Sequence, residues 1–156
     1  MENPAEFQLK KALRLHQLIE QTLDLLNNEI ISHKINLNTS FENQNILINI
    51  DPNQIKQVFL NIFLNSIEAM PNGGTLSVIG RSEETKQSHI IQITDTGCGI
   101  NPKDLPHIFD PFFTKKDHGT GLGLSITYEI IKNHNGKIFT ESELGKGTTI
   151  RIELPL

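Results

Sequence analysis

The sequence predicts an α+β fold, in which one mixed sheet carries helices packed on one of its faces. Two observations lead to this prediction. Segments with helical spacing of apolar residues are interleaved with short segments in which apolar and polar residues alternate. No internal repeat, low-complexity run or linker divides the chain, and its 156 residues correspond to about one domain.

The first elements follow from the periodicity of the apolar residues. Residues 1–12 are polar and mixed, and we interpret them as a tail or a linker remnant, with the folded domain in residues 13–156. Apolar residues then recur at helical spacing over residues 13–31, which predicts an amphipathic helix. Residues 34–40 alternate as a half-buried strand does, and a second alternation follows at Ile46, Ile48 and Ile50.

The next helix has clear start and stop signals. Asp51 is a suitable N-cap residue, and Pro52 follows it at the first helical position. The helix is expected to run to about Met70, where the sequence Pro-Asn-Gly-Gly at 71–74 stops it.

The second half of the chain contains a long irregular segment. The remaining regular elements are four strands and one helix, predicted over residues 75–80, 89–94, 137–141, 148–154 and 122–134. The polar residues 81–88 form an exposed connection between the first two of these strands. Residues 95–123 are rich in glycine and proline, and long irregular segments of this kind are usually functional.

Charge and composition exclude several classes of function. The formal net charge is −4 and there is no basic run, so we expect neither nucleic acid nor an anionic membrane as a direct partner. The one cysteine, Cys98, excludes an intramolecular disulfide and a cysteine-based zinc cluster. No stretch approaches the roughly 18 apolar residues of a spanning helix. We therefore expect a soluble, reduced, cytoplasmic domain.

A line of polar residues runs along the helix predicted over 51–70. Its apolar residues cover most of the circumference, which indicates a largely buried helix. Four polar residues spaced by four, four and three positions nevertheless share one side: Gln57, Asn61, Asn65 and Glu68. This line is either an exposed stripe on an amphipathic helix or the polar wall of a ligand cavity. In the second case an Asn oxygen suits Mg²⁺, which prefers oxygen ligands alongside water and phosphate.

A pair of glycines follows the strand predicted at 89–94, in the sequence DTGCGI. Gly97 and Gly99 permit backbone conformations closed to other residues and allow a flat ring to approach closely. Asp95, at the strand end, can accept hydrogen bonds from an exocyclic amine. A tight turn with a capping Asp explains the same pattern. We interpret Cys98 as a small buried residue rather than a reactive thiol.

A second glycine cluster, GTGLGL at 119–124, precedes the last helix. Free amides at a helix N-terminus form an anion site suited to phosphates, and neither the Walker nor the Rossmann spacing is present. The alternative is a mobile linker with a glycine-broken helix start. Lys116 can pair with phosphate charge or belong to a solvated face. We expect three aromatic residues of the preceding segment to anchor it to the core: Phe109, Phe112 and Phe113.

Together these motifs resemble the ATP-binding catalytic domain of two-component sensor histidine kinases, within the Bergerat-fold superfamily. The similar segments are NIFLNSIEAM at 61–70 (N box), DTGCGI at 95–100 (G1 box), IFDPFFTKK at 108–116 (F box), GTGLGL at 119–124 (G2 box) and GKGTTIRIELP at 145–155. The resemblance covers residues 13–156. It implies a two-layer α/β sandwich with a mixed five-stranded sheet, helices on one face and a flexible ATP lid.

The resemblance also implies ATP and Mg²⁺ as ligands. Asn65 would coordinate Mg²⁺, with Asn61 supporting it, and Lys116 would reach the phosphates, so these three residues are the expected catalytic set. The family often has Thr-Thr-Lys where this chain has Thr-Lys-Lys at 114–116.

The same resemblance also assigns residues to the adenine-binding site and to the ATP lid. Asp95 would bind the adenine amine, with Thr148 near the same ring, directly or through water. Gly97 and Gly99 would shape the base pocket. The lid residues that would border the phosphates are Gly119, Thr120, Gly121, Leu122 and Gly123.

The phosphoacceptor histidine of the family has no match in this chain. In the family it lies on a separate helical hairpin and is followed by an acidic residue, and the surroundings of His16 and His33 do not fit. The resemblance therefore implies the catalytic half of a protein histidine kinase, which transfers the γ-phosphoryl group to a histidine on the dimerisation domain of the same parent. A cognate response regulator is expected downstream. We expect the isolated chain to be a monomer, whether or not the parent is membrane-anchored.

Two other functions remain open at this stage. One is a degenerate, non-catalytic module that binds a nucleotide or a partner. The other is a different Bergerat-fold ATPase. In the gyrase, chaperone and mismatch-repair branches a Glu activates water at the position of Asn61, and an amide cannot take a proton. Efficient ATP hydrolysis is therefore not expected.

Overall fold

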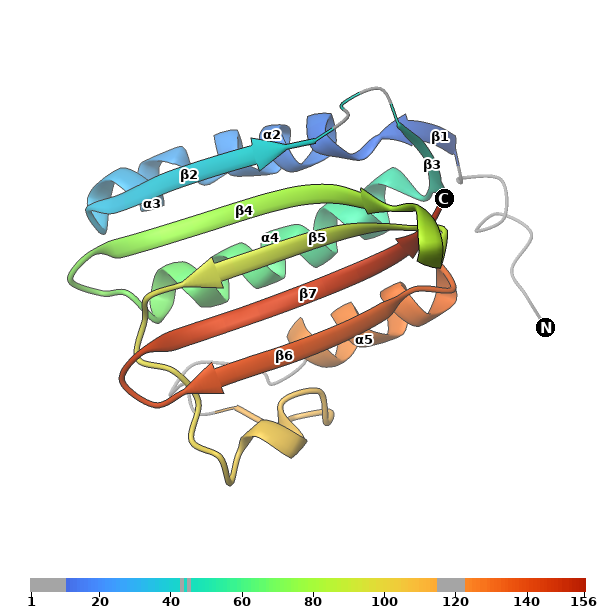
Figure 1. The fold of residues 1–156 in the computed structure, drawn as a ribbon. Helices are drawn as coiled ribbons and strands as arrows, with labels where there is room; N and C mark the ends of the chain where they lie inside the picture. The colour runs from blue at the N-terminus through green and yellow to red at the C-terminus, as the bar shows by residue number, and fades with distance from the viewer. Residues whose placement is uncertain (1–10, 43, 45, 115–122) are drawn as a thin grey trace.

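The computed structural model describes residues 11–42, 44, 46–114 and 123–156. In these ranges the chain forms two sheets and several helices (Figure 1). The strands are β1 (Lys11–Arg14), β2 (Ile35–Phe41), β3 (Leu47–Ile50), β4 (Gly74–Glu83), β5 (Ser88–Asp95), β6 (Lys137–Glu143) and β7 (Gly147–Pro155). The helices are α2 (Leu15–Leu25), α3 (Asn27–Ser32), α4 (Pro52–Glu68), α5 (Gly123–Asn133) and the short 3₁₀ turns η1 (Glu84–Lys86) and η2 (Leu105–His107).

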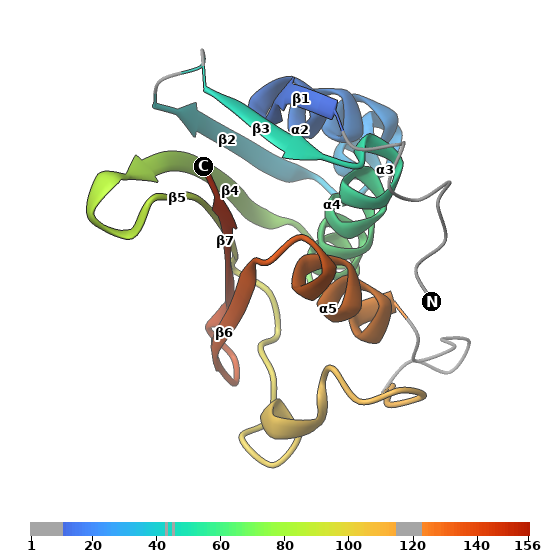
Figure 2. The ribbon, with the colours of Figure 1, turned by 90° about the vertical axis from the view of Figure 1, so that its right-hand side faces the viewer.

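The main sheet has five strands in the order β2-β4-β5-β7-β6. β2 runs parallel to β4, and the other three pairings are antiparallel. Figure 2 shows this sheet nearly edge-on, with α2, α4 and α5 on one side of it. The predicted mixed sheet with helices on one face is therefore confirmed.

The core lies between the helices and the sheet. Phe59 and Phe63 of α4 are at most 1% exposed and stack with ring centroids 5.9 Å apart. They belong to one cluster with buried residues of the sheet, such as Val78 and Ile152. Burial of so many apolar side chains along α4 makes it the central helix of the layer.

The start of the chain differs from the predicted helix over 13–31. Residues 11–14 form β1, which pairs antiparallel with β3 as a separate two-stranded sheet. The helix then begins at Leu15 and is interrupted at Leu26, whose backbone (φ −98°, ψ 9°) separates α2 from α3. Pairing with a distant strand therefore overrides the local helical pattern. Of the predicted tail, residues 1–10 lie outside the described residues.

The predicted signals at the ends of α4 are confirmed. The Asp51 carboxylate accepts hydrogen bonds from the backbone N–H groups of Asn53 (3.0 Å) and Gln54 (3.2 Å). Pro52 occupies the first helical position. The last turn ends at Glu68, before the turn that contains Gly73 at φ +100°. This cap fixes where each polar residue of α4 points.

A buried histidine joins the start of α4 to the end of α5. Nε2 of His134 accepts a hydrogen bond from the backbone N–H of Asp51 at 3.1 Å. Its Nδ1 lies 2.8 Å from the carbonyl oxygen of Ile130, so Nδ1 carries the proton. His134 therefore holds two helices of the layer together.

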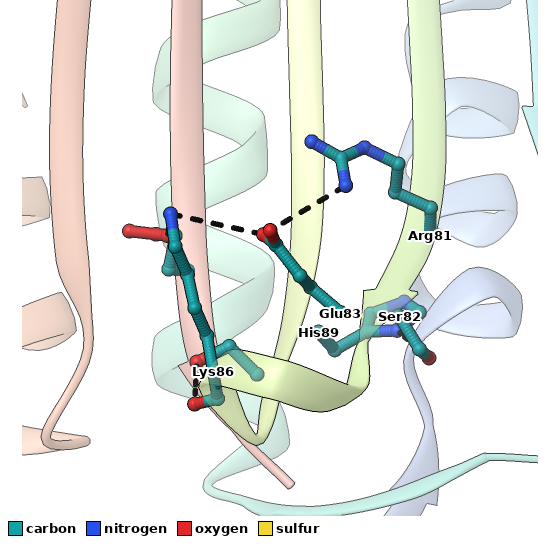
Figure 3. A network of polar contacts seen from close by, with 7 residues as sticks. Arg81, Ser82, Glu83, Lys86 and His89 are labelled. Carbon is teal, nitrogen blue, oxygen red and sulfur yellow. Dashed lines mark hydrogen bonds and ion pairs between the residues drawn. The ribbon is translucent and has the colours of Figure 1, made fainter.

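Strands β4 and β5 extend further than predicted. Half of the expected connection over 81–88 is strand, and η1 with Gln87 remains as the turn. Figure 3 shows charged side chains gathered there: Lys86 lies 3.7 Å from Glu83 and 3.5 Å from the buried Glu153, and Arg81 lies 3.8 Å from Glu83. Ser82 Oγ and Nδ1 of His89 are 3.2 Å apart beside this network.

The described helices include none that is long and apolar enough to cross a membrane.

Candidate functional site

Asp95 is the last residue of β5, and it is only 6% exposed. Its carboxylate accepts a hydrogen bond from the N–H of Gly97 at 2.9 Å and further hydrogen bonds from the side chain of Ser66 and the backbone of Thr148. Burial raises the pKa of Asp95 above its ordinary value, and these hydrogen bonds oppose the rise. The result is a buried acceptor whose orientation is fixed by neighbours on three elements of the chain.

The loop after Asp95 is held by its backbone between α4 and the β6–β7 hairpin. The N–H of Cys98 donates to the carbonyl of Ala69, directly after α4, at 3.1 Å. The carbonyl of Cys98 accepts from the N–H of Gly145 in the hairpin turn at 2.7 Å. The end of β5 and this hairpin lie at the same end of the sheet (Figure 1). The predicted tight turn is therefore a rigid connection between two elements.

The two glycines of this loop are required by neighbouring protein atoms. A Cβ atom at Gly97 would lie 2.7 Å from both the Cβ and the carbonyl oxygen of Ala69. Gly99 has φ +75°, and a Cβ there would collide with the backbone carbonyl of Glu143. Close packing of the loop against α4 and β6 explains both glycines. A role in shaping a base pocket stays a prediction.

Cys98 does not match its expected environment. The sequence suggested a small buried residue, but the side chain is exposed. Its backbone N–H and carbonyl are both used by neighbouring elements, which leaves the side chain on the outside of the loop. The prediction of a buried cysteine was wrong.

Asp95 belongs to a row of polar residues that crosses three strands. Thr148 of β7 is paired with Asp95 of β5 on one side and with Ser142 of β6 on the other. Directly paired residues point to the same face of a sheet, so the three side chains share the face that carries the helices. Ser142 Oγ lies 2.8 Å from Thr148 Oγ1. The half-buried Thr148 is thus placed beside Asp95, and its position near an adenine ring stays a prediction.

The polar line on α4 is half-buried in its middle and exposed at its ends. Gln57 and Glu68 are exposed, whereas Asn61 and Asn65 are partly buried. Ser66, the residue after Asn65, donates a hydrogen bond from its side chain to the Asp95 carboxylate at the end of β5. Partial burial of Asn61 and Asn65 fits either interpretation of this line, an exposed stripe or a polar wall.

Asn61 also connects α4 to the start of α5. Its Nδ2 donates a hydrogen bond to the carbonyl of Gly123 at 3.1 Å, and Thr127 Oγ1 donates to the same carbonyl at 2.9 Å. Of the lid residues named from the sequence, Gly123 is the one in the described part of the chain. The others lie outside it, as does the predicted phosphate-binding lysine: Gly119, Thr120, Gly121, Leu122 and Lys116.

The segment before the lid is attached through some of its apolar residues. Ile108 is buried, and the ring of Phe109 lies 5.4 Å from that of Tyr128 on α5. Phe113 contacts His107, with ring centroids 6.3 Å apart. Phe112 is 75% exposed at φ +66°, so the expectation that it anchors the segment was wrong.

The donor chemistry of the site fits a magnesium nucleotide. In the described ranges, no three His, Cys, Asp or Glu side chains are grouped so as to hold a metal ion. A metal at this place would depend on an amide oxygen, such as that of the half-buried Asn65, and on phosphate and water oxygens. That ligand set suits Mg²⁺ and excludes a structural zinc site.

Two residues of the site were missed by the sequence analysis. Ser66 is not one of the four polar residues named from the spacing on α4, although it follows Asn65 directly and bonds to Asp95. Ser142 lies between Glu141 and Glu143 in a strand that carries no glycine motif, and only the strand register brings it to Thr148. A cavity of about 200 Å³ also exists, but it lies at the opposite end of β7, between β3 and Leu154–Leu156.

Comparisons with known proteins identify the family of this chain. Residues 50–156 match the sequence profile of the family described as histidine kinase-, DNA gyrase B-, and HSP90-like ATPase. Sporulation kinase A of Bacillus subtilis (strain 168) is 42% identical over 154 residues, which are 97% of this chain and 25% of that protein. The chain thus spans about a quarter of that relative's length.

Solved structures show the same fold. The catalytic domain of the histidine kinase ThkA, in a nucleotide-free form, superposes with a TM-score of 0.83 at 31% identity, over 94% of this chain and 95% of that one. ThkA in complex with the response regulator protein TrrA gives a TM-score of 0.80 at 28% identity, over 94% of this chain and 41% of that one. The chain therefore belongs to the family of histidine kinase-, DNA gyrase B- and HSP90-like ATPases.

Proposed function

We propose that this chain binds ATP with Mg²⁺ and transfers the γ-phosphoryl group to a histidine on a separate dimerisation domain, as a step of two-component signalling. The observation that carries the proposal is the environment of Asp95. This carboxylate is buried and accepts hydrogen bonds from Gly97, Ser66 and Thr148. A carboxylate has about four lone-pair positions, so Asp95 can accept one more hydrogen bond, and the exocyclic amine of adenine can donate it.

The residues of the chain would divide the work between the two ends of the nucleotide. Asp95 and Thr148 bind the base, and Asn65 holds Mg²⁺, which neutralises phosphate charge when bound. In the transfer, the bond from the γ-phosphorus to the bridging oxygen breaks, and a bond to an imidazole nitrogen of the partner domain forms. ADP leaves, and the imidazole releases its remaining proton to solvent. Positioning and charge neutralisation, rather than a protein base, account for the rate.

Asn61 supports transfer over hydrolysis. Its Nδ2 is used in the hydrogen bond to Gly123, and an amide cannot accept a proton from water. A different ATPase of the family would need a water-activating carboxylate at this position. The complex of ThkA with TrrA supports a response regulator as a further partner of this chain. The cytoplasm, where both ATP and such regulators occur, is the proposed compartment.

Binding and transfer can be tested separately. Calorimetry with ATP, with and without Mg²⁺, measures the binding step, and Asp95→Asn is the matched variant. Radiolabelled ATP is then mixed with the chain and the isolated histidine-bearing dimerisation domain of the same parent kinase. The expected result is an acid-labile, base-stable label on that domain, which is lost when its phosphoacceptor histidine is replaced. Absence of nucleotide binding would refute the proposal, and binding without transfer would favour the non-catalytic module.

A further inference from the structure

The hydroxyl group of Ser142 uses its whole hydrogen-bonding capacity in contacts with neighbouring residues. The N–H of Ile100 donates to Ser142 Oγ at 2.8 Å. Ser142 Oγ lies 3.0 Å from the carbonyl oxygen of Gly147 and 2.8 Å from Thr148 Oγ1. A serine hydroxyl has one proton to donate and two lone pairs that accept. The three contacts therefore use the proton and both lone pairs of the Ser142 hydroxyl.

The chemistry of these partners fixes the direction of each hydrogen bond. A backbone N–H can only donate and a backbone carbonyl can only accept, so Ser142 accepts from Ile100 and donates to Gly147. One lone pair of Ser142 is left, and it faces Thr148. The Thr148 hydroxyl must therefore be the donor in this contact. Its own proton is then committed to Ser142, and only its lone pairs are available to another group.

The row of polar side chains that contains Ser142 and Thr148 also contains a second group that can only accept hydrogen bonds. Asp95 is paired with Thr148 across β5 and β7 on the helix-bearing face of the sheet. Its ionised carboxylate has no proton to donate. Two neighbouring acceptors match the edge of a purine that carries a 6-amino group, which donates. The two acceptors disfavour a 6-oxo group, which is itself an acceptor. Acceptors that face each other in a buried site lose their hydrogen bonds to water and gain none in return.

We propose that Ser142 is a positioning residue for base specificity, which holds the Thr148 hydroxyl as an acceptor and so makes the site prefer a 6-amino purine over a 6-oxo purine. This inference rests on the proposed function, in which Asp95 and Thr148 bind the base. Without Ser142, the Thr148 hydroxyl can rotate and donate its proton to a 6-oxo group. Ser142 itself touches no part of the base. Its effect must therefore pass through Thr148.

The experiment measures the ratio of the dissociation constants of inosine triphosphate and ATP, by calorimetry. These two nucleotides differ at position 6 of the base, an oxo group in one and an amine in the other, and at the neighbouring N1, which carries a proton only in inosine. The wild-type chain is expected to prefer ATP, and Ser142→Ala to lower the ratio by about fivefold, the size expected for one hydrogen bond. Ser142→Thr keeps the hydroxyl and should keep the ratio.

The opposite face of the same strands offers a matched control. Thr94 Oγ1 and Thr149 Oγ1 lie 3.1 Å apart, one residue along from Asp95 and Thr148. Thr149→Val removes that hydroxyl pair and is expected to leave the ratio unchanged. Thr148→Val should lower the ratio by itself, and adding Ser142→Ala to it should cause no further change. Ser142→Cys, which is close in size but only a weak donor and acceptor, should also lower the ratio and tests the inference if Ser142→Ala does not fold.

Three outcomes would overturn the inference. Ser142→Ala weakening both nucleotides equally would mean that Ser142 only stabilises the loop. A change of the ratio by Ser142→Ala in the Thr148→Val background would mean that the effect does not pass through Thr148. Binding of neither nucleotide by the wild-type chain would overturn the proposed function as well, and this result differs from a wild type that binds ATP with a ratio insensitive to Ser142.

Discussion

The side-chain amide of Asn61 donates a hydrogen bond to the carbonyl of Gly123 at 3.1 Å, across 62 positions of sequence. This contact joins the helix with the polar line to the first residue of α5, the helix that follows the glycine-rich segment. Thr127 reaches the same carbonyl from within α5. A residue expected to support the metal site therefore also positions the end of the lid sequence.

Removing this amide should loosen the start of α5. Asn61→Ala is expected to lower the free energy of unfolding by about 1 kcal/mol, the net value of one partly buried hydrogen bond. Amide hydrogen exchange should also become faster in the first turn of α5 but not in β4. Gln57→Ala, on the same side of α4 but exposed, is the control. Equal exchange rates in the wild type and Asn61→Ala would contradict the positioning role.

The metal role of Asn65 can be separated from its packing. Asn65→Ala is expected to weaken ATP binding at least about tenfold, or about 1.4 kcal/mol, when Mg²⁺ is present. Without Mg²⁺ the variant and the wild type should bind ATP similarly, because the amide oxygen then has no metal to hold. Calorimetry under both conditions checks this, with Gln57→Ala as control. A loss that is the same with and without Mg²⁺ would argue for packing alone.

The sequence predicted the elements whose signals are local. The Asp51–Pro52 start of α4, its apolar periodicity and its glycine stop are all read within a single helix, and the structure confirms them. β1 was missed because residues 11–14 acquire their strand conformation from β3, more than thirty positions away. Local patterns carry no information on such a partner.

The candidate site was predictable in its motifs but not in its connections. Asp95 and its two glycines were recognisable from the DTGCG sequence. The reason for Gly97 is its contact with Ala69, which the sequence does not reveal. Ser142 could not be predicted from the sequence either, because only the register of β6 and β7 places it against Thr148.

Gly97 should tolerate no side chain. Gly97→Ala would place a methyl group 2.7 Å from Ala69, and both the loop and the end of α4 would have to move. We expect a loss of about 1–3 kcal/mol in the free energy of unfolding, typical of overpacking. Gly145→Ala has open space around its Cβ but lies at φ +81°, so it should cost only the strain of about 1–2 kcal/mol.

A second variant identifies the cause of that loss. Ala69→Gly removes one of the two atoms that the new methyl group would meet, the Cβ, and leaves the carbonyl oxygen. The double variant should therefore recover part of the stability lost by Gly97→Ala, measured by urea denaturation. If Ala69→Gly simply adds its own cost to that of Gly97→Ala, the clash with the Cβ of Ala69 is not the cause.

His89 should make folding sensitive to mild acid. Burial lowers the pKa of His89 below its ordinary value of 6.5, with Glu42 opposing this and His16 adding to it. Between the two pKa values the unfolded chain binds a proton that the folded chain does not, so stability is lost as the pH falls through 6.5. Urea denaturation across this range should give a steeper pH dependence for the wild type than for His89→Gln. Identical slopes would show that another group is responsible.

The pH dependence of nucleotide binding should report Asp95. Burial raises the pKa of this carboxyl group above its ordinary value of 3.8, so it takes up a proton at a higher pH than an exposed aspartate. The protonated acid is a poorer acceptor, and ATP affinity should fall through that range. Asp95→Asn should bind ATP about ten- to a hundredfold more weakly at neutral pH, and without this dependence.

Loss of folding cannot account for this effect at Asp95. Because the folded state holds the proton of this group more tightly than the unfolded state does, its contribution to stability rises as the pH falls through the same range. Binding and stability should therefore change in opposite directions where Asp95 titrates. Calorimetric titrations and denaturation curves on the same samples separate the two. An affinity that falls equally in the wild type and in Asp95→Asn would assign the pH dependence to a different group and remove Asp95 from the base site.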